Sequence, residues 1–150
     1  TVFYAAAMGG TRGIYRSADT GATWTKVSDA TVDAALVTGG RVRMAAASGG
    51  QIWVAAVASG RLSAVFRYTH ASTSWVALGV PTTVELNGAV FGAHPGGQGN
   101  LHLSIAADPT NADIVYVGGD RQPCFSEAVN FNQCFPNGSG ALDYSGRLFR

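Results

Sequence analysis

The amino-acid sequence predicts an all-β protein made of successive antiparallel sheets, each with up to four short strands. Charged residues make up only 13% of the 150 residues, whereas glycine occurs 20 times, and this composition is typical of strands joined by tight turns. Short apolar segments rich in β-branched and aromatic residues recur along the chain, and they are too short to be helices. One group of residues also recurs at a fixed spacing, which indicates a repeat architecture.

The repeat is centred on an aliphatic residue, an aromatic residue and an arginine in succession. Residues 13–17 read Gly-Ile-Tyr-Arg-Ser, and residues 64–68 read Ala-Val-Phe-Arg-Tyr, 51 positions further along the chain. The same displacement relates Trp24 to Trp75, and residues 146–150, Gly-Arg-Leu-Phe-Arg, begin a third copy. We therefore expect each copy to form the same strand, termed c, in three consecutive sheets.

The other strands follow from their positions relative to this repeat. A strand b precedes each copy, at residues 2–7, 51–56 and 113–118. A strand a precedes the second and third of these, at residues 42–47 and 101–107. A strand d begins at each tryptophan that follows a copy, at residues 24–27 and 75–78. The resulting order is b-c-d, a-b-c-d and a-b-c, which predicts ten strands.

Four short strands in about 50 residues is the period of a β-propeller blade. The sequence therefore predicts one partial propeller domain over 1–150, with part of a blade at 1–28, a blade at 41–78 and part of a blade at 101–150 that contains a loop insertion at 119–145. These make about two and a half blades, whereas closed propellers have roughly four to eight. We expect a fragment of a larger ring, whose remaining blades are its partner. The alternative is a ring completed by oligomerisation.

Residues 17–24, Ser-Ala-Asp-Thr-Gly-Ala-Thr-Trp, fit the pattern S-x-D-x-G-x-x-W. Asp19 can accept hydrogen bonds from backbone N–H groups of its own turn, and Gly21 supplies a positive φ. Trp24 opens strand d and is expected to bury its ring between neighbouring sheets. The pattern resembles the Asp box of sialidases, sortilin-type receptors, xyloglucan-cleaving endoglucanases and photosystem-assembly propellers. The resemblance implies a structural role for the box and for the tryptophan of the second copy: Ser17, Asp19, Gly21, Trp24 and Trp75.

A second segment, residues 104–119, resembles the a–b hairpin of the same propellers, in which D-P-x-N-x-x-x-V-Y closely follows a strand. Asp108 and the proline after it begin a turn there, and Asn111 tolerates a left-handed backbone. Asp108 and Asp113 together supply too few ligands for a calcium site. The sequence predicts no metal and no cofactor, because it has neither zinc-ligand spacing nor a glycine-rich phosphate loop.

The alternation of strand direction divides the connections between two faces of the sheets. The two longest connections, 79–100 and 119–145, both fall on the face shared by the d–a and b–c links. Connections of this length are usually functional or disordered, so we expect a binding surface there, with these candidates: Asp120, Arg121, Glu127, Tyr144 and His94. The alternative is that Arg121 pairs with a neighbouring acid such as Asp120 or Asp143 and has a structural role only.

Two cysteines lie ten positions apart in the second of these connections. Cys124 and Cys134 favour a local disulfide, which implies an oxidising compartment, and the alternative is two unpaired thiols. Asn137 begins an Asn-Gly-Ser glycosylation sequon, relevant in a eukaryotic secretory pathway. We therefore expect an extracellular or secreted protein, with periplasmic and cell-surface locations included.

Charge and hydropathy exclude two classes of partner. The formal net charge is +1, and the arginines are scattered, so the basic stripe of a nucleic-acid binder is missing. No apolar run approaches the roughly 20 residues of a membrane span.

The sequence favours a glycan- or protein-binding scaffold module. The second candidate is part of a glycoside hydrolase of the sialidase or endoglucanase type, with catalytic residues partly or wholly outside this segment. The third is a self-assembling lectin or a structural filament subunit. No catalytic residue is predicted in this chain, because the fold alone does not choose among these functions.

Overall fold

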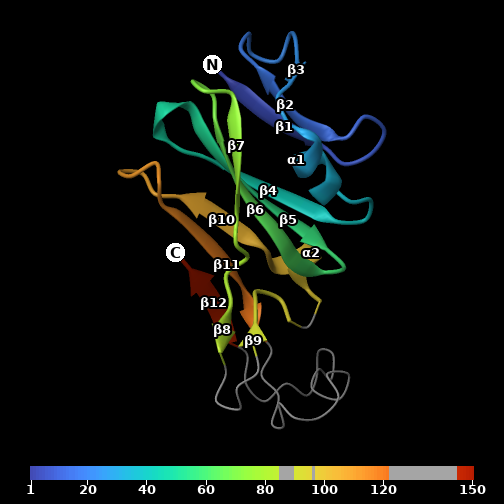
Figure 1. Cartoon of the computed structure of the whole chain (residues 1–150), viewed down its shortest axis with the longest axis vertical. Helices are drawn as coiled ribbons and strands as arrows, with labels where there is room; N and C mark the ends of the chain where they lie inside the picture. Colours follow the sequence, from blue (N-terminus) through green and yellow to red (C-terminus); the bar gives the residue numbers. More distant parts are fainter. Residues whose placement is uncertain (85–89, 96, 122–144) are drawn as a thin grey trace.

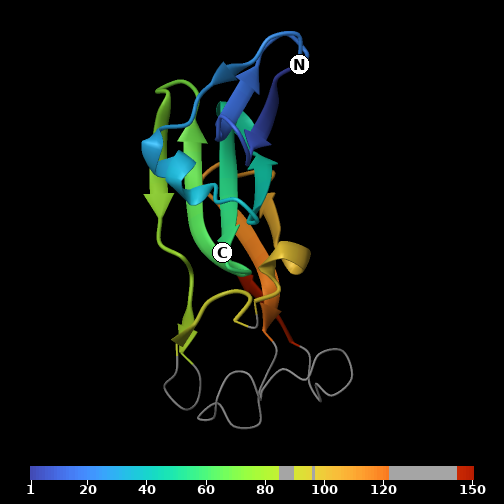
Figure 2. The ribbon, with the colours of Figure 1, turned by 90° about the vertical axis from the view of Figure 1, so that its right-hand side faces the viewer.

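The computed structural model describes residues 1–84, 90–95, 97–121 and 145–150. These residues form two three-stranded sheets, one four-stranded sheet and one two-stranded ribbon, and every strand pair is antiparallel. The three larger sheets follow one another along the long axis of the molecule (Figure 1 and Figure 2). The predicted all-β class is confirmed.

The three sheets contain the ten predicted strands, paired in sequence order. The first sheet contains β1 (Phe3–Ala7), β2 (Gly13–Ser17) and β3 (Thr25–Lys26). The middle sheet contains β4 (Arg41–Ala46), β5 (Gln51–Ala58), β6 (Arg61–Thr69) and β7 (Ser74–Leu78). The third sheet contains β10 (Ser104–Ala107), β11 (Val115–Arg121) and β12 (Ser145–Phe149).

The connections contain short elements that the sequence pattern does not predict. They are α1 (Ala30–Ala35), the 3-10 turn η1 (Ser48–Gly50), β8 (Thr83–Val84), β9 (Val90–Phe91) and α2 (Gly99–His102). The side chain of Asp29 caps α1 by accepting a hydrogen bond from the Val32 N–H at 2.9 Å. Helix α1 is one turn and a half long, too short for a helical period to be visible in the sequence.

Strand β5 of the middle sheet is buried on both faces, because it contributes residues to two hydrophobic cores. Ile52 and Val54 pack in the core shared with the first sheet. Ala55 and Val57 pack in the core shared with the third sheet. Every residue of β5 from 52 to 57 is buried, which explains why this strand reads as a continuous apolar run without polar alternation.

The middle and third sheets also meet through their first strands, since β10 packs against β4. At the same boundary, the Trp53 indole N–H donates to the carbonyl of Ala112 at 3.2 Å, and Arg67 pairs with Asp113. The described residues form no closed ring, so the structure shows consecutive antiparallel sheets and not a complete propeller.

The two repeat tryptophans occupy different environments, and the prediction of a buried Trp24 is wrong. Trp24 precedes β3, is 43% exposed, and donates its indole N–H to the Gly21 carbonyl at 3.0 Å. Trp75 lies in β7 and donates to the Val27 carbonyl of the first sheet at 2.7 Å. The physical reason is that the Trp75 ring packs into the core between the first and middle sheets, whereas the Trp24 ring lines an open cavity between them.

Candidate functional site

The candidate site lies where the connection between β7 and β10 meets the end of β11. This end of the molecule contains β8, β9 and the ends of β11 and β12 (Figure 1). Of the predicted residues, His94 from the connection and Asp120 from β11 come together here, although they lie 26 positions apart in the sequence. Their contact gives the connection a fixed position on the third sheet.

His94 and Asp120 are joined by side chains and by backbone. The His94 ring is 0% exposed, and its Nδ1 is hydrogen-bonded to Asp120 Oδ1. The His94 backbone N–H donates to the Asp120 carbonyl at 3.0 Å. The ring lies over Gly119, where an added Cβ would stand 2.7 Å from both Cε1 and Nε2 of His94. Glycine at 119 is therefore required for the imidazole to approach β11 this closely.

The backbone of His94 is strained, with φ at 59°. A left-handed conformation costs a residue other than glycine on the order of 1 kcal/mol or more. The Gly97 N–H donates to the His94 carbonyl at 3.0 Å and closes a turn at this point. The hydrogen bond with Asp120 and the burial of the ring offset the strain, so this geometry depends on tertiary contacts.

The environment of Asp120 has opposing electrostatic effects. Partial burial would raise the pKa of its carboxyl, but the hydrogen bond and the charge of His94 lower it, and the net shift of the Asp120 pKa is downward. Asp120 Oδ2 and His94 Nε2 are buried and have no hydrogen-bond partner among the described residues. A carboxylate beside an imidazole can orient the ring and stabilise its charge. The ring is fully buried against β11, so His94 holds the connection in place on the third sheet.

The other predicted binding residues are not placed at this site. Arg121 ends β11 opposite Ser145, and its side chain lies outside the description. The remaining predictions of binding, disulfide and glycosylation also lie outside the described residues, and they concern Glu127, Tyr144, Asp143, Cys124, Cys134 and Asn137. Asp120 itself pairs with His94, a partner that the sequence analysis did not consider for it.

The turn at residues 17–24, whose sequence resembles an Asp box, contains the backbone hydrogen bond expected for Asp19. The Thr23 N–H donates to Asp19 Oδ1 at 2.9 Å, and the Thr23 hydroxyl donates to Oδ2 at 2.6 Å. The Ser17 hydroxyl donates to Asp19 Oδ1 at 2.7 Å and accepts from the Gly21 N–H at 2.8 Å. These donors, with Thr23 first, hold the pKa of Asp19 well below its usual range. Gly21 has φ at 97°. Both carboxylate oxygens are used inside the turn, which indicates a structural role.

The Asp108 turn is organised in the same way. Asp108 Oδ1 accepts from the N–H groups of Thr110 at 2.8 Å and Asn111 at 3.0 Å, and the Tyr116 hydroxyl donates to Oδ2 at 2.9 Å. The Thr110 hydrogen bonds, followed by that of Tyr116, lower the pKa of Asp108 to about 2. Asp113 pairs with Arg67 instead of facing Asp108. In the described part of the chain, no group of three His, Cys, Asp or Glu side chains could hold a metal.

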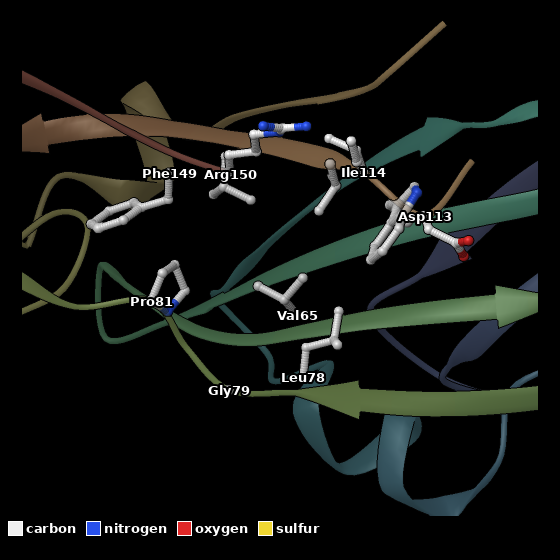
Figure 3. A pocket seen from close by; sticks show the side chains of 11 residues that line it. Val65, Leu78, Gly79, Pro81, Asp113, Ile114, Phe149 and Arg150 are labelled. Atoms are coloured by element: carbon white, nitrogen blue, oxygen red, sulfur yellow. The ribbon is translucent and has the colours of Figure 1, made fainter. Parts of the chain in front are cut away.

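Sequence reasoning missed two apolar cavities between the sheets. One, of about 550 Å³, lies between the middle and third sheets, where Leu78, Pro81 and Phe149 converge (Figure 3). The other, of about 450 Å³, lies between the first and middle sheets and includes Phe3 and Trp24. Cavities of this size can hold large side chains or small ligands.

Comparison with protein-family models, curated proteins and solved structures finds no match to this chain. Within the described ranges, no helix is long and apolar enough to cross a membrane. The function must therefore be argued from the geometry of the chain itself.

Proposed function

We propose that this chain is a scaffold segment of an Asp-box β-propeller in an extracellular or surface protein, with a glycan or a protein as its ligand. The observation that carries the proposal is a contrast in burial between strands. The central strand of the middle sheet, β5, is covered on both faces by the neighbouring sheets. The first and third sheets leave large apolar side chains uncovered.

The uncovered side chains are large and lie on the two outer sheets. Phe3 is 43% exposed on β1, and Leu148 is 73% exposed on β12. In repeat architectures, each unit buries its apolar surface only against neighbouring units, and exposed apolar patches mark interaction surfaces. Further sheets of the same kind would cover these side chains as the first and third sheets cover β5. This supports a segment of a larger array.

The ligand-binding face is assigned to the end where the connection between β7 and β10 is held by His94 and Asp120. A rigid connection lowers the entropy lost when a ligand binds. The same connection is held at a second point, since the Gly99 N–H donates to the Gly60 carbonyl of the β5–β6 turn at 2.6 Å. Two attachment points on different sheets support a preorganised surface for a glycan or a protein.

The scaffold role is tested with a dye that fluoresces on exposed apolar surface, combined with light scattering of the 150-residue chain. We expect strong dye binding and self-association, and Leu148→Glu should reduce the dye signal by about half, because one large uncovered side chain is removed from the apolar surface. Val84→Glu is the matched control, because Val84 is 72% exposed on β8, outside the three sheets. A monomeric chain without dye binding would contradict the proposal.

The binding face is tested by screening the chain against immobilised glycans and secreted proteins. For a ligand found in this way, Asp120→Ala should weaken binding about tenfold by releasing the connection, equivalent to ~1.4 kcal/mol. Asp113→Ala, in the turn between β10 and β11, should leave the affinity unchanged. Equal effects of the two substitutions would place the ligand elsewhere.

A further inference from the structure

The cavity between the middle and third sheets corresponds to a region between the first and middle sheets that the Trp75 ring occupies. In this region, the Trp75 ring packs on Tyr68 with centroids 4.9 Å apart and edge-on to Phe66 at 6.3 Å. Its indole N–H reaches across to the Val27 carbonyl of the first sheet at 2.7 Å. Trp75 belongs to β7, which is strand d of the middle sheet. The side chain that occupies this region therefore comes from strand d.

The internal repeat relates the residues that line the cavity to residues of the core around Trp75. The 51-residue displacement relates Val27 to Leu78, and the aliphatic-aromatic-arginine motif relates Phe66 to Phe149. Strand register relates a third pair, because one residue of β5 faces Phe66 and one residue of β11 faces Phe149. With the aliphatic residue of the motif, four pairs result: Val27 and Leu78, Ile14 and Val65, Phe66 and Phe149, Val54 and Val117.

In each of these four pairs, one residue lies in the core around Trp75 and the other lines the cavity between the middle and third sheets. The first member of every pair belongs to the core that contains Trp75. The second member of every pair lines the cavity of about 550 Å³. Figure 3 shows three of these side chains, from Val65, Leu78 and Phe149, at the cavity wall. The cavity is therefore lined by the counterparts of residues in the core around the Trp75 indole, and no described side chain fills it.

The strand that would supply such an indole also has a place to pair. In the middle sheet, β6 pairs with β5 on one edge and with β7 on the other. In the third sheet, β12 pairs with β11, and it is the last strand in the order of that sheet among the described residues. An open strand edge can accept an added antiparallel strand through main-chain hydrogen bonds.

We propose that β12 and the cavity form one docking site for an antiparallel strand that carries an indole, the counterpart of β7. The strand pairs with the outer edge of β12. Its indole fills the space between Phe149 and Leu78 and directs its N–H toward the Leu78 carbonyl, as Trp75 does toward Val27. The inference rests on the proposed scaffold function and identifies the partner as a strand of the same repeat.

The test extends the chain after Arg150 by a copy of residues 68–79. Arg150 stands at the repeat position of Arg67, so the added segment continues from β12 as residues 68–79 continue from β6. We expect the midpoint of thermal unfolding to rise by about 4 °C or more, the shift that burial of a large apolar side chain gives in a chain of this size. Amide exchange at residues 146–149 should slow by about tenfold or more.

Two control variants separate indole binding from simple lengthening of the chain. An extension that carries Trp75→Ser in the copy should lose at least half of the rise in midpoint. In the host chain, Leu78→Glu places a carboxylate in the cavity and should abolish the rise. Ala77→Glu, at the neighbouring position whose side chain points to the opposite face of β7, should retain it.

Several outcomes would overturn the proposal. They are an equal rise with and without the indole, a rise that survives Leu78→Glu, and no rise at all. A dimeric parent chain whose residues 146–149 are already protected would show that a second copy occupies the edge. None of these results depends on the dye experiment, because Leu148 and Phe149 alternate on β12 and face opposite sides of the third sheet. The scaffold proposal can therefore fail separately.

Discussion

The aspartates of this chain show two uses of a carboxylate, distinguished by how far away the partner is in the sequence. Asp19 and Asp108 are bound by groups of their own turns, at most eight positions away. Such turns are recognisable from the sequence, because spacing alone brings the donors close. Asp120 is bound by His94, 26 positions away. No local pattern indicates this pair, although both residues were singled out as polar groups in long connections.

The lowered pKa of Asp120 leads to a prediction about pH. A carboxyl whose folded-state pKa lies below its unfolded value of about 3.9 stabilises the fold above that pH, and the contribution is lost as pH falls through the folded-state pKa. We expect Asp120→Asn to lower the unfolding midpoint at pH 7, with the difference from the parent chain shrinking below about pH 4. Thermal unfolding followed by circular dichroism between pH 7 and pH 3 measures this.

Asp113→Asn is the control for this titration. Asp113 is ion-paired with Arg67, but the Asp113 side chain is 72% exposed, and exposed ion pairs contribute little to stability. The Asp113→Asn midpoint should follow that of the parent chain across the whole range. A difference for Asp120→Asn that stays constant down to pH 3 would show that the carboxylate charge is not what His94 recognises.

At the scale of elements, β3 and β7 show how one repeat position acquires two environments. In the first copy, Ser17 forms part of the Asp-box turn, and the Trp24 indole bonds to the same turn. In the second copy, Tyr68 stands in place of Ser17, and the Trp75 ring packs on it. The sequence predicts both strands, but it does not show that only the second indole packs into a hydrophobic core.

The two tryptophans make a matched pair for mutagenesis. Trp75→Ala should destabilise the chain by about 3 kcal/mol, because it leaves a cavity against Tyr68 and Phe66. Trp24→Ala should cost about 1 kcal/mol or less, since that ring is 43% exposed. Urea unfolding followed by circular dichroism gives both values. Equal losses would mean that Trp24 is buried in solution and that the first sheet is covered.

At the scale of the whole molecule, burial is distributed unevenly over three sheets of similar construction. The core between the first and middle sheets includes α1, whose Val32 is 0% exposed, and the indole of Trp75. The core between the middle and third sheets is interrupted by the cavity of about 550 Å³. The middle sheet belongs to both cores, so its opening requires that both be disrupted.

This arrangement predicts a gradient of amide hydrogen exchange. Amides of β5 should exchange slowest, and those of β3 and β12, at the ends of their sheets, should exchange faster by on the order of 100-fold. Exchange measured residue by residue by NMR at a single pH tests the order. Protection of β12 equal to that of β5 would show that its outer edge is paired, and similar rates throughout would indicate one cooperative unit.

The sequence by itself determined the number, order and pairing of the ten strands in the three sheets, the hydrogen bonding of Asp19 within its turn, and the presence of a turn at Asp108. These features depend on side-chain alternation and on groups a few positions apart, which a sequence displays directly. Only the tertiary structure decided that Trp24 is exposed while Trp75 is partly buried, that His94 pairs with Asp120, and that Phe149 lines an apolar cavity. Each of these depends on which sheet covers which face, and distant parts of the chain meet only when the sheets pack.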